Sequence, residues 1–278
     1  MKVRAHAKIN LNLRILRKRI DGFHDIETLM VPISLHDVLD IERTQGGALE
    51  FTCSRNDLNS DDNLVVRALR LLESFVERPL PVCIHLTKQV PSGAGFGGGS
   101  GDAAAALVAV RDLFTLDEVT DTQLESIAAQ LGSDIPFFIK GKPKICRGRG
   151  EILEPAPFDQ ELPLVLFKHP LDIPTPWAYQ KWADSVEHPS LPYVAQIQPW
   201  GEIVNDLECP VFAKYQILGE MKRWLLEQPE AEAASMTGSG SALFAILKDP
   251  QQAEALIQRA QERYGASLWA QTATVLTG

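Results

Sequence analysis

Apolar and polar residues alternate in short runs along the first third of the chain, which is the pattern of strands that bury one face. These runs predict strands at 3–7, 9–15, 38–43, 49–53 and 82–87. Before the last of these strands, apolar residues recur every three or four positions from Leu64 to Phe75 and predict an amphipathic helix. Asp61, Asp62 and Asn63 directly precede this helix and are suited to cap its first turn.

Two further helices are predicted in the middle of the chain. The stretch from Asp102 to about Leu113 is rich in alanine and leucine, which favour helix. In the stretch that follows, apolar residues share one helical face, Thr122 and Glu125 form a capping box, and Gly132 closes the end. Helix therefore follows helix here, with no strand between them.

The second half of the chain shows a new order of elements beyond Pro155 and Pro157. Its pattern predicts a strand at 162–167, a helix at 211–226, strands at 233–236 and 241–247, a helix opened by Asp249 and Pro250, and a strand at 267–276. Strand, helix, two strands, helix, strand is the order of the ferredoxin-like fold. We therefore expect two α+β domains, 1–156 and 157–278, with a substrate cleft between them.

Composition and charge narrow the range of partners. The chain has 278 residues, 45% hydrophobic and 23% charged, as in an ordinary globular protein. The net charge of -9 argues against nucleic acid, whose binding needs a basic surface. Four scattered cysteines without Cys-x-x-Cys spacing predict neither a metal centre nor a disulfide framework. No stretch is apolar enough for a signal peptide or a membrane span, so we expect a cytoplasmic protein without a membrane partner.

The strongest functional signal is a glycine-rich loop between the strand at 82–87 and the helix near Asp102. Six of the nine residues from Gly93 to Gly101 are glycine. Because glycine has no side chain, such a backbone can approach a ligand closely, and the first N–H groups of the next helix lack intrahelical partners. With the helix dipole they form a site for an anion, most often phosphate. The loop predicts a nucleotide-binding protein.

Other interpretations of this loop fit the sequence less well. A flexible linker would lack the apolar strand and helix on its two sides. The P-loop pattern needs Lys-Ser or Lys-Thr directly after the last glycine, and Gly101 is followed by Asp102. The dinucleotide fingerprint matches at Gly93, Gly95 and Gly98, but a second helix stands where that fold needs a strand. No His-Arg-Asp or Asp-Phe-Gly segment marks a protein kinase.

Two residues are candidates for phosphoryl transfer, which needs a group that orients the attacking hydroxyl and cations that spread charge. Asp134 is followed by the apolar residues 135–138, where shielding raises the basicity of a carboxylate; alternatively, it only caps the next helical turn. Lys8 shares the polar face of a strand with Asn10 and Asn12. That face either lines a cleft or meets solvent.

Weaker signals lie in a turn and in two basic clusters. Phe23 is suited to stack on a flat ring, and His24 to make a hydrogen bond. The clusters within 14–19 and 140–149 are typical of solvated strand ends, with a phosphate-rich substrate as the less common alternative.

Several segments carry a family resemblance along nearly the whole chain. They are Ala7–Leu11, Asp21–His24, Asp62–Leu64, Pro91–Ser100 with Asp102–Ala104, Leu131–Phe137, Gly148–Glu151, Ile173–Pro176 and Met236–Ser241. In this order they resemble the GHMP kinase superfamily, to which the glycine loop alone would point. The segments Asp-Gly-Phe-His, Ile-Pro-Thr-Pro and Leu-Gly-Ser-Asp-Ile-Pro narrow the resemblance to the 4-diphosphocytidyl-2-C-methyl-D-erythritol kinases.

This resemblance implies a two-domain GHMP-kinase-like α+β fold, with a ribosomal-protein-S5-domain-2-like N-terminal half and a ferredoxin-like C-terminal half. It implies ATP-dependent phosphorylation of the 2-hydroxyl of a cytidine diphosphate derivative of methylerythritol, a small-molecule substrate of isoprenoid precursor biosynthesis, with Mg²⁺ as cofactor. Lys8 and Asp134 fall on the family's catalytic residues. A lysine beside the carboxylate would keep it ionised and stabilise the transferring phosphoryl group.

The resemblance also implies the binding residues. Those for ATP are Asn63, Lys88, Pro91, Ser92, Gly93, Ala94, Gly95, Phe96, Gly97, Gly98, Gly99, Ser100 and Gly101, with the adenosine end near Asn63 and Lys88. Those for the substrate are Asn10, Phe23, His24, Thr175 and Tyr179, with two aromatic rings around the cytosine.

Two positions depart from the family's usual pattern. Phe23 stands where members usually carry tyrosine, which keeps the ring and loses only a hydroxyl. Ser100-Gly101 stands in place of Ser-Ser, so no magnesium ligand is assigned. Two alternatives stay open: another GHMP-type kinase that acts on a mevalonate- or homoserine-like alcohol, and a nucleotide-binding protein without catalysis. The sequence predicts no oligomeric state.

Overall fold

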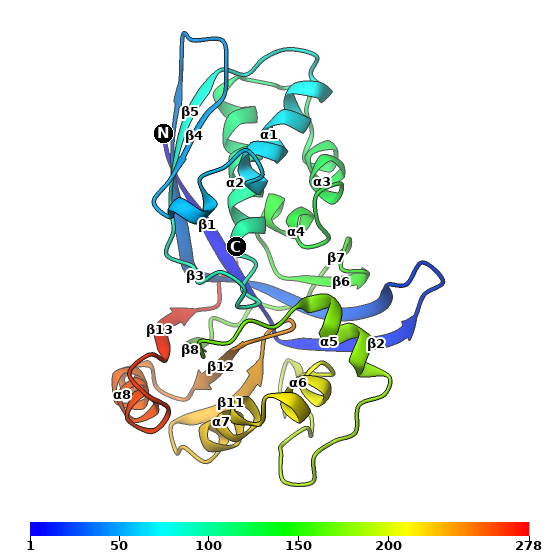
Figure 1. Ribbon diagram of the computed structural model, residues 1–278, viewed down its shortest axis with the longest axis vertical. Helices are drawn as coiled ribbons and strands as arrows, with labels where there is room; N and C mark the ends of the chain where they lie inside the picture. Colours follow the sequence, from blue (N-terminus) through cyan, green and yellow to red (C-terminus); the bar gives the residue numbers. More distant parts are fainter. Residues whose placement is uncertain (278) are drawn as a thin grey trace.

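The computed structural model describes residues 1–277 and contains two β-sheets, each covered by helices on one face (Figure 1). The nine strands of the first sheet are β1 (Lys2–Asn10), β2 (Asn12–Lys18), β3 (His24–Arg43), β4 (Glu50–Cys53), β5 (Val82–Thr87), β6 (Lys144–Gly148), β7 (Ile152–Pro155), β9 (Gln196–Gln198) and β10 (Gly201–Asn205). The second sheet has β8 (Pro163–Lys168), β11 (Ala231–Met236), β12 (Ala242–Leu247) and β13 (Trp269–Thr274).

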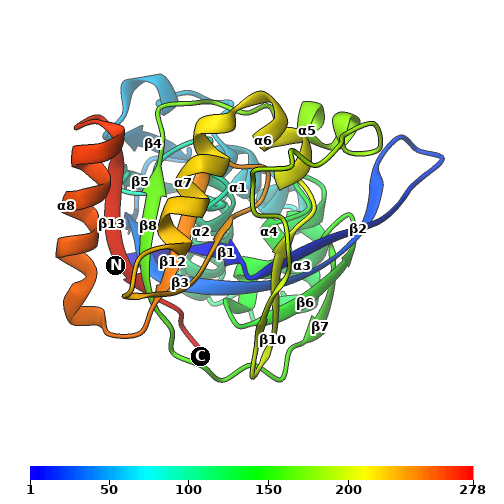
Figure 2. The same cartoon turned by 90° about the horizontal axis from the view of Figure 1, so that it is seen from below.

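The helices divide between the two sheets. On the first sheet lie α1 (Leu64–Phe75), α2 (Gly98–Leu113), α3 (Asp121–Ala129) and α4 (Ile135–Lys140). In the other half of the molecule are α5 (Thr175–Trp182), α6 (Glu208–Lys214), α7 (Gln216–Leu226) and α8 (Ala253–Tyr264), of which α7 and α8 cover the second sheet (Figure 2). None of the helices in residues 1–277 combines the length and the apolar character needed to cross a membrane.

A shared core fixes the two halves against each other. Ile9 and Val31 of the first sheet pack with Leu166 and Phe244 of the second, and all four side chains are buried. Burying such side chains contributes about 1.5–3 kcal/mol each, so the halves do not behave as loosely tethered bodies. The cleft between them therefore has firmly held walls.

The second sheet has the predicted ferredoxin-like topology, because its strands run in the order β11-β12-β8-β13 and every neighbouring pair is antiparallel. A segment of the second half departs from this plan: β10 pairs in parallel with β2 and so extends the first sheet. The division of the chain into domains 1–156 and 157–278 stays a prediction.

Several boundaries differ from the sequence predictions. The capping box is formed by Thr120 and Gln123, not by Thr122 and Glu125, and α3 ends at Ala129. The predicted helix at 211–226 is two helices, because the backbone leaves helical geometry at Tyr215.

The predicted strand at 38–43 is only the end of β3, which has 20 residues. Its central residues are buried on both faces, and Pro32 lies within it, so its alternation is masked. Ile9 belongs to β1 rather than to the next strand, and Leu11 separates β1 from β2.

Candidate active site

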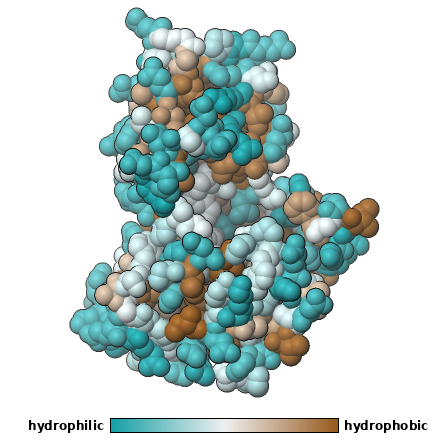
Figure 3. All heavy atoms as spheres, viewed as in Figure 1, coloured by the Kyte–Doolittle hydropathy of each residue, from teal (hydrophilic) through white to brown (hydrophobic). Residues whose placement is uncertain are grey.

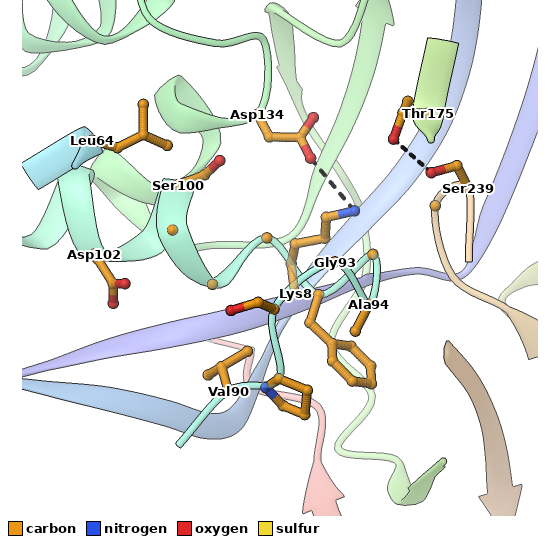
Figure 4. Close-up of a pocket in the computed structure, with 18 of the residues that line it drawn as sticks. Lys8, Leu64, Val90, Gly93, Ala94, Ser100, Asp102, Asp134, Thr175 and Ser239 are labelled. Carbon is orange, nitrogen blue, oxygen red and sulfur yellow. Dashed lines mark hydrogen bonds and ion pairs between the residues drawn. The ribbon is translucent and has the colours of Figure 1, made fainter. Parts of the chain in front are cut away.

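A cleft of about 520 Å³ lies where the glycine loop faces the second half of the molecule. The surface is hollowed between an upper and a lower body in the space-filling view (Figure 3). Among its lining residues are Lys8, Asn10, Asn63, Lys88, Pro91–Ser100, Asp102, Asp134, Arg149, Thr175, Tyr179, Gly238 and Ser239. The structure thus brings most of the predicted site residues to one cavity (Figure 4).

The glycine loop ends in a helix N-terminus that faces this cleft. Helix α2 begins at Gly98, earlier than predicted, so Gly98, Gly99 and Ser100 form its first turn and line the cavity. The N–H groups of a first turn have no carbonyl partner within the helix, and the helix dipole adds positive potential. A helix start of this kind is suited to bind phosphate.

Gly101 has a different role from the other loop residues. Its N–H donates to the carbonyl oxygen of Gly97 at 2.8 Å, and Gly101 does not line the cleft. A Cβ at this position would lie 2.6 Å from the carbonyl oxygen of His6 on β1. Glycine at 101 therefore lets α2 pack closely on β1, which gives a structural reason for its departure from the family's serine.

Gly97 needs to be glycine on two grounds. Its φ is +69°, and a Cβ there would lie 2.8 Å from Phe138 and 3.2 Å from the Lys8 side chain. For a residue with a side chain, this backbone conformation alone costs roughly 1–2 kcal/mol, before any steric overlap.

We expect Gly97→Val to raise KM for ATP by tenfold or more and to lower kcat, because the valine displaces both the loop and Lys8. Steady-state kinetics and calorimetric titration of ATP measure the two effects. The matched control is Gly265→Val, at a φ of +99° with only the Ser267 hydroxyl within reach. It should lower the melting temperature without changing ATP affinity. Equal ATP affinity in folded Gly97→Val and wild type would show that the loop does not hold phosphate.

Lys8 and Asp134 face each other across the cleft. The Lys8 Nζ lies 3.5 Å from Asp134 Oδ2 and donates to Asn10 Oδ1 at 2.6 Å (Figure 4). Lys8 is only 3% exposed, so the alternative that it faces solvent is wrong. Asp134 stands at the N-cap position of α4, but its side chain makes no capping hydrogen bond, so the capping alternative also fails.

Asn10 connects this pair to the second half of the molecule. Its side-chain amide donates to Thr28 Oγ1 at 2.8 Å, and its backbone N–H donates to Thr237 Oγ1 at 3.0 Å. Because Asn10 Oδ1 accepts from Lys8, these bonds fix the direction of the ammonium group. The loop after β11 therefore helps to position Lys8 from the opposite sheet.

Lys88 has a buried environment that the sequence did not reveal. Its ammonium lies between the carboxylates of Asp37 and Asp102, and donates to Asp102 Oδ2 at 2.7 Å. Burial raises the pKa of Asp102 to about 8, although the Lys88 charge opposes this rise. Asp37 also accepts from the N–H of Val90 at 2.8 Å. The cluster therefore ties both ends of the glycine loop to β3.

Asn63 lines the cleft as predicted, with its amide engaged in local structure. Its Oδ1 caps α1 by accepting from the N–H of Val65 at 2.9 Å, and its Nδ2 donates to the carbonyl of Leu58 at 2.9 Å. Asn63 and Lys88 are thus held rigidly in the cavity wall; their role in binding adenosine stays a prediction.

At the other end of the cleft, the structure separates the predicted substrate residues. Tyr179 and Thr175 of α5 line the cavity, and the Thr175 hydroxyl lies 2.7 Å from that of Ser239 (Figure 4). His24 is stacked on Tyr179, with ring centroids 5.5 Å apart, and lies behind the cavity wall. Phe23 is 53% exposed in the hairpin between β2 and β3, which projects from the body in Figures 1 and 2.

Two pKa shifts follow from this arrangement. Burial, and then the negative charge of Asp134, raise the pKa of the Tyr179 hydroxyl, which therefore stays protonated as a hydrogen-bond donor. Burial, and then the charge of Lys18, lower the pKa of His24. The neutral imidazole suits its position against the Tyr179 ring.

Ser239 and Arg149 line the cleft but were not predicted as site residues. Ser239 belongs to the Thr237–Gly240 turn, which packs against Gly95, where a Cβ would overlap the Thr237 carbonyl. The signal for Ser239 was present as a glycine-rich turn between two strands. Arg149 belongs to a basic cluster, and only the resemblance segment Gly148–Glu151 marked it among the basic residues around it.

Family comparisons agree with this architecture. Residues 63–142 match the GHMP kinases N terminal domain, and residues 192–266 match the GHMP kinases C terminal domain. A crystal structure of homoserine kinase from Cytophaga hutchinsonii superposes with a TM-score of 0.65 at 15% identity, over 99% of this chain and 95% of that one, which shows a shared fold. Fold and site together define a GHMP-type kinase.

Proteins of higher sequence identity show which family within this class the chain belongs to. The 4-diphosphocytidyl-2-C-methyl-D-erythritol kinase of Methylacidiphilum infernorum is 41% identical over 95% of this chain and 93% of its own length. That of Porphyromonas gingivalis is 38% identical over 89% and 92%. A crystal structure of 4-(cytidine 5'-diphospho)-2C-methyl-D-erythritol kinase superposes over the whole of both chains, with a TM-score of 0.82 and 33% identity. The chain belongs to the 4-diphosphocytidyl-2-C-methyl-D-erythritol kinase family.

Proposed function

We propose that this protein transfers the γ-phosphoryl group of ATP to the 2-hydroxyl of 4-diphosphocytidyl-2-C-methyl-D-erythritol. One observation carries the proposal: a buried lysine and a carboxylate meet at 3.5 Å in the same cleft as a phosphate-binding helix N-terminus. The identity of the family supports the choice of substrate. A cytoplasmic location remains a prediction.

The glycine loop would hold the phosphates of ATP. The first-turn N–H groups of Gly98, Gly99 and Ser100 meet the negative charge, and the absence of side chains allows close approach. The Ser100 hydroxyl lines the cleft beside the loop and would suit Mg²⁺, a hard cation that would neutralise phosphate charge there.

Asp134 would orient the acceptor hydroxyl and take its proton. Its side chain is 39% exposed toward the cavity, so a substrate hydroxyl can reach it. Lys8 places a positive charge beside this carboxylate and where the phosphoryl group would pass. Phosphoryl transfer needs this positioning and charge more than covalent chemistry.

Two alternatives are weaker on these observations. The mevalonate and homoserine kinases superpose at only 11–15% identity and so share the fold alone. A nucleotide-binding protein without catalysis would have no need for both Lys8 and Asp134 in one cleft.

The test is ATP consumption with 4-diphosphocytidyl-2-C-methyl-D-erythritol, mevalonate and homoserine as acceptors. Turnover of the cytidyl compound is expected, and turnover of another acceptor alone would overturn the proposal.

The aromatic residues near α5 should determine substrate affinity. If Phe23 and Tyr179 contact the cytosine, each alanine variant should raise KM for the cytidyl substrate about tenfold to a hundredfold, because stacking on one base contributes ~1–3 kcal/mol. KM for ATP should hardly change. The double variant should lose less than the sum of the single losses, because both rings share one ligand.

Two control variants separate stacking from simple loss of packing. Phe75 is exposed like Phe23, and Tyr215 is packed edge-on against Trp177 away from the cleft. Their alanine variants should keep the wild-type KM for both substrates. Unchanged KM for the cytidyl substrate in folded Phe23 and Tyr179 variants would remove the cytosine contact, and melting temperatures would report any loss of packing.

A further inference from the structure

The basic cluster at 140–149 separates in the structure into surface ion pairs and one residue in the cleft. Lys140 pairs with Glu125 at 3.2 Å, and Arg147 pairs with Glu27 and Glu154 on the sheet surface. Lys140 ends helix α4 and Arg147 lies on β6, so these residues are surface ion-pair partners rather than strand ends. Arg149 lines the cleft instead, on the same cavity as Asp134 and Tyr179.

The turn between β6 and β7 places Arg149 in a defined position. Gly148 and Gly150 flank it with φ of +68° and +113°, and a Cβ on Gly150 would lie 3.8 Å from Asp134 Oδ1. The backbone N–H of Arg149 donates to Glu151 Oε2 at 2.6 Å. Its guanidinium lies over the ring of Phe23, 4.8 Å from the centroid. The turn thus lies beside Asp134, and the Arg149 side chain reaches from it to the projecting hairpin.

Among the cationic side chains that line this cleft within residues 1–277, Arg149 has the weakest interaction with a carboxylate. Lys8 donates to Asn10 at 2.6 Å beside Asp134, and Lys88 lies between two carboxylates. Arg149 Nε is 3.7 Å from Glu151 Oε1, which is longer than a hydrogen bond.

The carboxylate of Asp21 interacts electrostatically with Arg149, but it accepts its hydrogen bonds from Arg19. It is therefore not free to neutralise Arg149. The N–H groups of the Arg149 guanidinium are therefore available to donate hydrogen bonds to a ligand in the cleft.

We propose that Arg149 binds the diphosphate of the cytidyl substrate and, by stacking on Phe23, fixes the hairpin beside the bound cytidine. This inference rests on the proposed function, which supplies a substrate with a diphosphate between the cytidine and the reacting alcohol. A guanidinium suits this role because its planar donors match phosphate oxygens in pairs. Its position between Phe23 and Asp134 corresponds to the place of the diphosphate between base and hydroxyl.

The test compares CDP with cytidine, which differ only in the diphosphate. Calorimetric titrations of both, with the ATP site saturated by a non-hydrolysable ATP analogue, use the wild type, Arg149→Ala and Arg149→Lys. We expect Arg149→Ala to bind CDP about tenfold to a hundredfold more weakly, as for a lost hydrogen bond to a charged group, with cytidine affinity within about twofold. Arg149→Lys should lie between the two. Arg147→Ala is the matched control, because Arg147 lies two residues earlier, on β6, and does not line the cleft; it should bind CDP like the wild type.

Two outcomes of these titrations would overturn the inference. CDP affinity could be unchanged in Arg149→Ala, or the loss could fall equally on cytidine, which would make Arg149 a support for Phe23 only. Turnover of the cytidyl compound by the wild type tests the proposed function separately. Either idea can therefore fail while the other stands.

Discussion

Asp134→Asn should abolish turnover while leaving ATP affinity within a few-fold of the wild type. The amide keeps the size of the carboxylate but accepts no proton, and it no longer attracts the Lys8 ammonium at 3.5 Å. General-base catalysis contributes about 10²–10⁴-fold to a rate, so kcat should fall by at least two orders of magnitude. The ATP phosphates contact the loop rather than Asp134 in our proposal, so binding survives. Single-turnover kinetics and ATP titration measure the two quantities.

The matched control for this variant is Asp121→Asn. Asp121 also stands at the start of a helix and pairs with a cation, Arg111 at 2.6 Å, but it does not line the cleft. Its replacement should change stability slightly and leave kcat intact. More than about a tenth of wild-type activity in Asp134→Asn would rule out Asp134 as the base.

Much of the fold was predictable, because local patterns and tertiary packing agree. The strand at 82–87 and the helix at 64–75 appear within their predicted bounds, since alternation and helical periodicity are clear there. The split helix at Tyr215 and the long β3 were not predictable from periodicity. Both involve contacts between segments far apart in the chain, because β3 pairs with β1, β5 and β6, and Tyr215 packs against Trp177.

The site was predictable where chemistry is concentrated in a short segment, and not where it is assembled across the fold. The glycine loop and Asp134 stand in distinctive local sequences. Asp37, by contrast, occupies one position of an ordinary strand, and only the fold brings it to Lys88. Arg149 stands in the resemblance segment Gly148–Glu151, but its charge alone does not separate it from the basic residues around it, and the turn after β6 directs it to the cleft.

Lys8→Met should also lower kcat by two orders of magnitude or more, for an electrostatic reason. Methionine fills nearly the same buried space but carries no charge, so the transferring phosphoryl group loses its nearby cation. Removing one partner of an ion pair is costly where the other charge stays buried, but the Asp134 side chain is 39% exposed and is solvated by water in the variant. The protein should therefore fold and bind ATP.

A variant that keeps the charge distinguishes this electrostatic role from a structural one. Lys8→Arg retains a cation at this position, although the guanidinium is larger than the ammonium it replaces. If the charge is required, Lys8→Arg should recover part of the kcat that Lys8→Met loses. Lys2→Met, on the same strand but exposed and 3.7 Å from Asp40, should keep the wild-type kcat. A normal kcat in Lys8→Met would exclude the ammonium from catalysis, and equal losses in folded Lys8→Arg and Lys8→Met would mean that Lys8 only supports the geometry of the cleft.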